Sequence, residues 1–146
     1  MYTSIVRAVQ AWKTQGAALL PSQDQLSVQE RFAAAGIAVT ADLQFLYSLC
    51  GGMPSDGGDD NWFELWPPEK CIHELSETVF LAPASGFLAF ASGFLSAHAY
   101  CLRPNDSRTS SVFVAYEPRH PPELVASSLD QAFEYLLSEP KRLHLP

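Results

Sequence analysis

Apolar residues recur every three to four positions in the first third of the chain, which is the interval of one helix face. The pattern predicts a helix over residues 2–15, which Gly16 would end, and a short second helix over residues 28–35. Thr40 is a suitable N-cap for a third helix, which would stop at the double glycine of residues 51–52. We therefore expect helices to dominate this third of the chain.

Beyond the double glycine the apolar residues alternate, as they do in strands that are buried on one side. The expected strands cover residues 61–66, 86–91, 97–104, 111–118 and 123–128. Pro67 and Pro68 introduce a short helix, and Ser128 caps a closing amphipathic helix. The order predicts an α+β fold, with a mainly antiparallel mixed sheet that is packed by N-terminal helices and a C-terminal helix.

The length of 146 residues predicts a single domain over residues 1–146. Residues 1–36 could form an N-terminal helical extension to a core over residues 37–146. The three cysteines are widely spaced, no signal peptide is visible, and both features predict a cytoplasmic protein. The uncharged stretch of residues 78–102 is long enough to cross a bilayer, but Pro, Gly and Ser interrupt it as they do buried strands, so no membrane partner is expected. The motif "ASGFL" occurs there twice, at residues 84–88 and 91–95, and predicts similar turn-then-strand segments.

Several kinds of chemical site can be tested against the loop "GGMPSDGGDDNW". An EF-hand that starts at Asp56 fails because Gly58, Asn61 and Pro67 occupy positions that need other residues. A phosphate cradle would need a lysine or a strand-to-helix turn, and here acids surround the glycines. The chain has no nucleophilic serine motif, and its cysteine and histidine spacings are not those of zinc sites. We expect no catalysis, no metal and no cofactor.

Acidic residues are concentrated in one window of the chain. Between Asp56 and Glu77 lie seven acids and one base, a local net charge of minus six, against minus seven for the whole chain. Such a window disfavours nucleic acid and anionic membranes, and it favours a basic protein partner. Exposed aromatic residues beside the acids would serve as anchors, although alternation along a strand must turn some of them inward. The candidate partner-binding residues are Asp56, Asp59, Asp60, Trp62, Glu64, Trp66 and Glu69.

The order of several short pieces resembles the SUKH superfamily, which contains the cell-wall assembly regulator family and many bacterial toxin-immunity proteins. The pieces are "TADLQFLYSLCGG", "FELWPPEKCIHEL", "LAFASGFLSAHAYCLRP", "SVFVAY" and "VASSLDQAFEYLLSEP". They span the chain from about Ile37 to its end. The chain departs from the family at Cys50, where an Asn is common, and at Leu129, where a Phe is common.

The resemblance implies an α+β sheet packed by helices and a protein that acts by binding. Immunity members of the family neutralise toxins, often nucleases, which are commonly basic where they grip nucleic acid. Our leading hypothesis is therefore an immunity protein that binds a basic toxin through the acidic window. The alternatives are a regulatory adaptor for a signalling or cell-wall-synthesis protein, and a small enzyme that uses Cys71 or Cys101 with a histidine.

Overall fold

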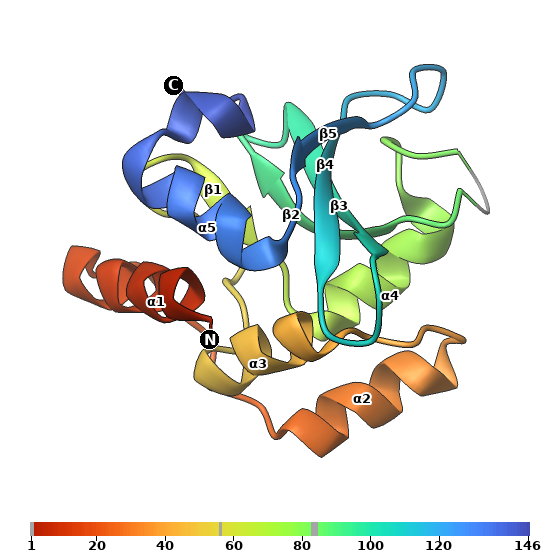
Figure 1. Cartoon of the computed structure of the whole chain (residues 1–146), viewed down its shortest axis with the longest axis horizontal. Coiled ribbons are helices and arrows are strands. Elements are labelled where there is room, and N and C mark those ends of the chain that lie inside the picture. Colours follow the sequence, from red (N-terminus) through yellow and green to blue (C-terminus); the bar gives the residue numbers. More distant parts are fainter. Residues whose placement is uncertain (1, 56, 83–84) are drawn as a thin grey trace.

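A five-stranded antiparallel sheet with helices packed against it forms the fold of the computed structural model (Figure 1), which describes residues 2–55, 57–82 and 85–146. The helices are α1 (Thr3–Gln15), α2 (Gln25–Ala34), α3 (Ala41–Leu49), α4 (Pro68–Glu77), α5 (Leu129–Ser138) and the 3₁₀ helix η1 (Pro140–Leu143). The strands are β1 (Phe63–Leu65), β2 (Leu88–Gly93), β3 (His98–Pro104), β4 (Ser110–Ala115) and β5 (Glu123–Ala126). The α+β fold class that the sequence predicts is confirmed.

The sheet is a meander in which each strand pairs with the next one along the chain, in the order β1-β2-β3-β4-β5. All of the described pairs are antiparallel, so the sheet is simpler than the mixed sheet that the sequence allowed. Register shifts lie between Ala89 and Ala91 in β2 and between Val112 and Phe113 in β4. The shift in β2 leaves Phe90 without a partner in β3. β2 is buried along its whole length.

Local signals explain most of the helix boundaries. Gly16 has a φ of 76°, the left-handed conformation that ends α1. The side chain of Asp24 accepts a hydrogen bond from the Ser27 amide, so α2 starts three residues earlier than predicted. Ser128 caps α5 in the same way, through the Gln131 amide. Thr40 precedes α3 as predicted, but its hydroxyl bonds another side chain instead of capping the helix.

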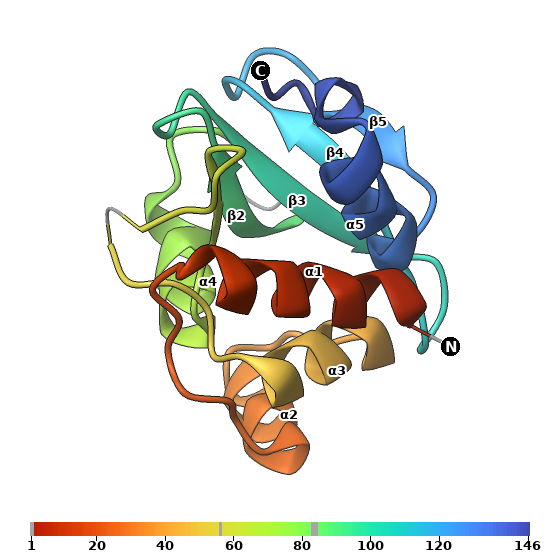
Figure 2. The ribbon, with the colours of Figure 1, turned by 90° about the vertical axis from the view of Figure 1, so that its left-hand side faces the viewer.

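The N-terminal helices belong to the same hydrophobic core as the sheet. Ile5, Val9 and Trp12 of α1 are buried in it together with side chains of α5, and Figure 2 shows α1 lying between α5 and α3. The connection from α1 to α2 is bonded to the double glycine, since the Leu20 amide donates to the carbonyl of Gly52 at 2.8 Å. A side chain at Gly51 would place its Cβ 2.1 Å from the carbonyl oxygen of Pro21, which explains the need for glycine.

Four aromatic rings fill the space between α1, α5 and the sheet. Trp12 stacks on Phe63 at 6.0 Å between ring centroids, and Phe133 meets both rings edge-on at 5.7 and 5.8 Å. The ring of Tyr100 lies 5.2 Å from that of Phe63, and its hydroxyl donates to the carbonyl of Leu143 at 2.6 Å. This cluster fixes β1, and with it the loop that precedes β1, to the rest of the protein.

The uncharged stretch of residues 78–102 contains β2 and most of β3. Within the described parts of the chain, no helix combines the length and the apolar character that crossing a bilayer requires.

Candidate partner-binding surface

Asp59 organises the loop that leads into β1. One of its carboxylate oxygens accepts hydrogen bonds from the backbone amides of Asn61, at 2.8 Å, and Phe63, at 3.0 Å. The other accepts from the indole Nε1 of the buried Trp12, at 2.8 Å. Burial raises the pKa of Asp59, and these three hydrogen bonds offset part of the rise. The carboxylate therefore ties the loop to α1 and to the first residue of β1.

Trp62 lies between the two amides that Asp59 binds, and its backbone is strained. Its φ of 68° is in the left-handed region, and 47% of its surface is exposed. Its carbonyl accepts a hydrogen bond of 2.9 Å from the amide of Phe94, the first residue after β2. Figure 2 shows the loop before β1 and the turn after β2 lying together at one end of the sheet.

The turn between β2 and β3 holds three further left-handed residues in succession. Phe94, Leu95 and Ser96 have φ values of 52°, 57° and 64°. A non-glycine residue in this conformation costs about 1 kcal/mol or more. Phe94 and Leu95 are nevertheless 48% and 79% exposed, and the Phe94 ring lies 6.2 Å from that of Trp62. The strained backbone conformation thus keeps large apolar side chains exposed to solvent.

We call the group of Trp62, Phe94, Leu95 and the neighbouring Asp60 the Trp62–Leu95 surface. Beside it lies a hollow of about 770 Å³, to which Trp62, Leu95 and Asp60 contribute walls. Asp59 and Glu64 also line this hollow, and its described walls contain no basic side chain. The arrangement combines exposed aromatic and aliphatic groups with negative charge.

The structure separates the acids that the sequence grouped together. Asp60 is exposed, and its amide donates to the side chain of Gln15. Glu64 is largely buried and lies 3.5 Å from the ammonium of Lys70. Glu69 is exposed but pairs with Arg31 of α2, and it does not line the hollow. Asp60 is therefore the acid of the predicted set that the described contacts leave most available to a partner.

Trp66 is not available as an anchor, which corrects the sequence-based expectation. Only 2% of its surface is exposed, and its indole Nε1 donates to the hydroxyl of Ser92 at 3.2 Å. The ammonium of Lys70 lies 4.7 Å from the centre of its ring. Leu65 and Trp66 are both buried, because the alternation of buried and partly exposed side chains ends with β1. Asp56, the remaining candidate, lies outside the described residues.

Sequence reasoning missed Phe94 and Leu95. They close the second copy of "ASGFL", in which Ala91, Ser92 and Gly93 end a strand and the turn follows. In the first copy Leu88 instead begins the strand. The expectation of turn-then-strand segments is therefore wrong for the second copy. A signal was present, because Phe-Leu-Ser-Ala between two alternating segments is an unusually apolar hairpin turn.

The three cysteines are buried. Burial raises the pKa of Cys71 and of Cys101 to about 12, and it also raises the pKa of Cys50. Cys71 lies 3.2 Å from the hydroxyl of the buried Tyr47. A nucleophilic cysteine needs the opposite, a lowered pKa and access to substrate. The geometry thus gives no support to a thiol enzyme. In the described segments, no group of three or more potential metal ligands comes together.

The structure is a small α+β domain with an exposed apolar patch on a strained backbone. Comparison of the sequence with models of known protein families gave no match, and a search among curated proteins gave no significant match.

Proposed function

We propose that this chain is a non-catalytic binding protein, an immunity protein that neutralises a basic toxin of the nuclease type by covering it with the Trp62–Leu95 surface. The observation that carries the proposal is the backbone strain at Trp62, Phe94, Leu95 and Ser96. Strain of this kind persists where the surrounding structure enforces it, and it clusters at functional sites. Here its result is an exposed apolar patch, which supports a contact with another protein.

The chemistry of the surface indicates what the partner presents. Aromatic side chains contribute most to binding when they lie at the centre of an interface, so Trp62 and Phe94 are the expected anchors. Asp60 and the acid-lined hollow beside them would attract a partner with basic side chains around an apolar spot. The resemblance to the SUKH superfamily supplies the immunity role and the cytoplasmic location as parts of the proposal.

The test is affinity capture from a lysate of the source cells with the wild-type chain and with Leu95→Asp. Leu124→Asp is the matched control, because Leu124 is also exposed but lies on β5. We expect one basic protein that the wild type and the control retain and that Leu95→Asp loses. Expression of that protein alone should be toxic to cells, and co-expression of the wild-type chain should restore growth.

Two outcomes would contradict the proposal. If Leu95→Asp retains the same protein as the wild type, the Trp62–Leu95 surface is not the contact. If the retained protein is a harmless endogenous enzyme whose activity the chain alters, the immunity role is wrong and the regulatory adaptor is favoured.

A further inference from the structure

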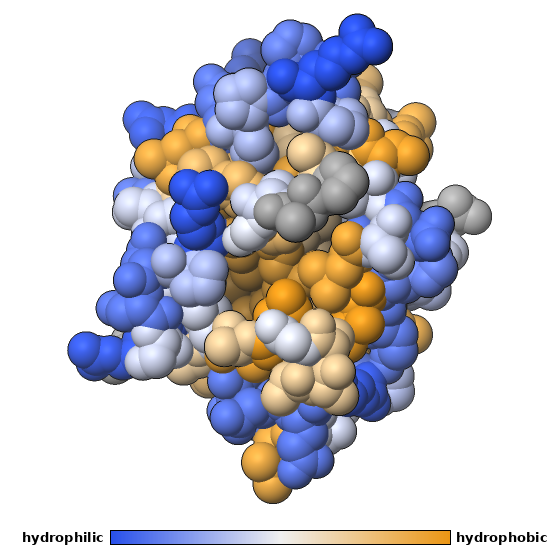
Figure 3. All heavy atoms as spheres, turned by 90° about the vertical axis from the view of Figure 1, so that its right-hand side faces the viewer, coloured by the Kyte–Doolittle hydropathy of each residue, from blue (hydrophilic) through white to orange (hydrophobic). Residues whose placement is uncertain are grey.

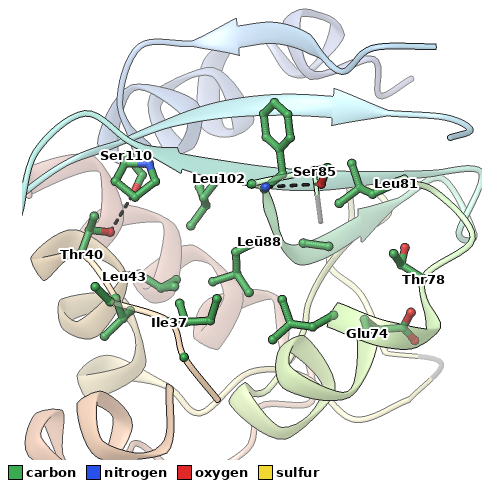
Figure 4. Close-up of a pocket in the computed structure, with 18 of the residues that line it drawn as sticks. Ile37, Thr40, Leu43, Glu74, Thr78, Leu81, Ser85, Leu88, Leu102 and Ser110 are labelled. Atoms are coloured by element: carbon green, nitrogen blue, oxygen red, sulfur yellow. Dashed lines mark hydrogen bonds between the residues drawn. The ribbon is translucent and has the colours of Figure 1, made fainter. Parts of the chain in front are cut away.

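A second hollow lies against the sheet, and it shares no lining residue with the Trp62–Leu95 surface or with the hollow beside that surface. It is a cavity of about 440 Å³ between the sheet, α4 and the segment that joins α2 to α3. Figure 3 shows its mouth as an apolar hollow, and Figure 4 shows side chains from all three walls pointing into it. We call it the Leu102 cavity. Its volume is within the range of about 300–1,000 Å³ that small-molecule sites occupy.

Most of the cavity wall is apolar. Leu88 and Leu102 form its floor on β2 and β3, where they are directly paired. Ile37 and Leu43 approach from the α2–α3 side, and Leu81 approaches from the segment after α4 (Figure 4). An apolar chain or ring inside the cavity would contact these side chains in place of water.

A relay of hydrogen bonds fixes the polarity of one end of the cavity. The hydroxyl of Thr40 donates to the carboxylate of the buried Asp42 at 2.6 Å. The hydroxyls of Thr40 and Ser110 lie 2.6 Å apart (Figure 4), and the only proton of Thr40 is already used. Ser110 must therefore donate its own proton to Thr40. What remains on Ser110 for a ligand is acceptor capacity alone.

The charges around the cavity also favour a ligand that donates hydrogen bonds. Glu74 of α4 is the charged side chain among the described lining residues, and Asp42 lies behind Thr40. The Ser110 amide donates to the second oxygen of Asp42 at 3.0 Å, which holds the relay in place. At the end of the cavity that the relay lines, a carboxylate ligand would meet acceptors that have no proton to give. The hydroxyls of Thr78 and Ser85 line the cavity away from that end (Figure 4). A ligand that donates a hydrogen bond would satisfy Ser110.

We propose that the Leu102 cavity binds a small amphiphile, with an apolar chain or ring inside the cavity and a terminal hydroxyl or amine that donates to Ser110. The site discriminates against carboxylates of the same shape. The ligand class follows from the walls and the relay, and it does not depend on the partner of the Trp62–Leu95 surface.

The test uses three probes that share one alkyl chain, namely octan-1-ol, octylamine and octanoate. Each is titrated into the full chain by calorimetry, and amide chemical shifts map where it binds. We expect the alcohol and the amine to shift the amides of Leu88 and Leu102. Octanoate should bind at least tenfold more weakly.

Ala38→Trp supplies the blocking variant, because Ala38 lines the mouth of the cavity and is exposed. Ala34→Trp is the matched control, on an exposed position of α2 that does not line the cavity. The blocking variant should lose at least tenfold in affinity for octan-1-ol, and the control should not change. A thermal unfolding transition in both variants would show that they are folded. Equal binding of all three probes, binding of none of them, or unchanged binding to Ala38→Trp would overturn the proposal.

Discussion

The Trp62–Leu95 surface and the Leu102 cavity both leave apolar side chains unburied, and the two are built in opposite ways. At the Trp62–Leu95 surface, large apolar side chains extend into solvent from a loop and a turn that hold four left-handed residues. The Leu102 cavity encloses its apolar side chains, and none of its described non-glycine lining residues has a positive φ. Exposed apolar patches suit contacts with another protein, whereas cavities suit small ligands.

The supports of the two regions differ as well. Polar groups hold the Trp62–Leu95 surface from below, through Asp59 under Trp62 and His98 at the base of the turn. The Leu102 cavity instead lies where the described helices and strands leave space between them. Buried polar groups therefore maintain backbone strain at the Trp62–Leu95 surface, whereas the Leu102 cavity is recognised by its open space. Each of the following predictions tests one half of this contrast.

The largest expected effect compares leucines in the packed and in the hollow part of the core. Leu136→Ala in α5 should lower the free energy of unfolding by about 4 kcal/mol, because its side chain is fully surrounded. Leu102→Ala should cost only about 2 kcal/mol, because one side of Leu102 already faces the cavity and lacks contacts there. Urea denaturation measures both values. Equal losses would mean that the cavity is filled or collapsed in solution.

Asp59 tests the support beneath Trp62. Asp59→Ala leaves the indole of Trp12 and the amides of Asn61 and Phe63 without their acceptor. We expect a loss of about 3 kcal/mol in the free energy of unfolding, measured in urea, because buried donors without partners are costly. The control is Asp60→Ala, next in the sequence but exposed, which should change stability by less than about 0.5 kcal/mol. Similar losses in the two variants would show that Asp59 does not organise the loop.

His98, at the base of the turn between β2 and β3, should make the stability of the fold depend on pH. Its partner in β2 is Gly93, where a Cβ would come within 2.6 Å of His98 Nε2. Tyr100 gives its proton to Leu143, so His98 Nε2 donates to the Tyr100 oxygen, at 3.0 Å. Burial and, to a smaller extent, the neighbouring His144 together lower the pKa of His98 to about 4. His144 itself contacts Glu123 and Tyr116.

The unfolded chain therefore takes up the His98 proton first, near pH 6.5, and the folded chain only near pH 4. The stability that neutral His98 provides is complete above pH 6.5 and is lost as the pH falls toward 4. Between pH 7 and 4 the wild type should lose about 2–3 kcal/mol more than His98→Gln, in urea denaturation at each pH. The difference removes the contribution of the carboxylates. Parallel pH profiles would show that His98 does not carry this dependence.

The fold was predictable because local signals and periodicity agree in most of the chain. Gly16, Pro68 and Ser128 each mark a helix end where the structure has one. The elements then follow one another in a meander, which needs no long-range choice of partner. Some element boundaries differ by a few residues, as for α2, whose cap at Asp24 was overlooked. The short 3₁₀ helix η1 was not predicted.

The candidate site was predictable only in part, because the sequence does not show which acidic side chains are buried, paired or exposed. Asp59 and Asp60 are neighbours, yet one binds Trp12 of α1 and the other faces solvent. Glu69 meets Arg31, thirty-eight positions away, across a contact between α4 and α2. Phe94 and Leu95 lie between two expected strands, and the left-handed turn there leaves their side chains exposed. The partners of Asp59 and Glu69 depend on tertiary contacts that no local pattern encodes.

Leu95 gives the smallest expected effect and the most direct test of strain held for function. Leu95→Gly removes the cost of a left-handed leucine, and it loses little packing because the side chain is largely exposed. The free energy of unfolding should rise by about 0.5–1 kcal/mol, measured in urea, while binding of the captured partner weakens. Leu124→Gly on β5 is the control and should lower stability, because glycine weakens a strand. A variant that is both less stable and equally able to bind would mean that the turn is held by its side chain, and the Trp62–Leu95 surface would lose its functional argument.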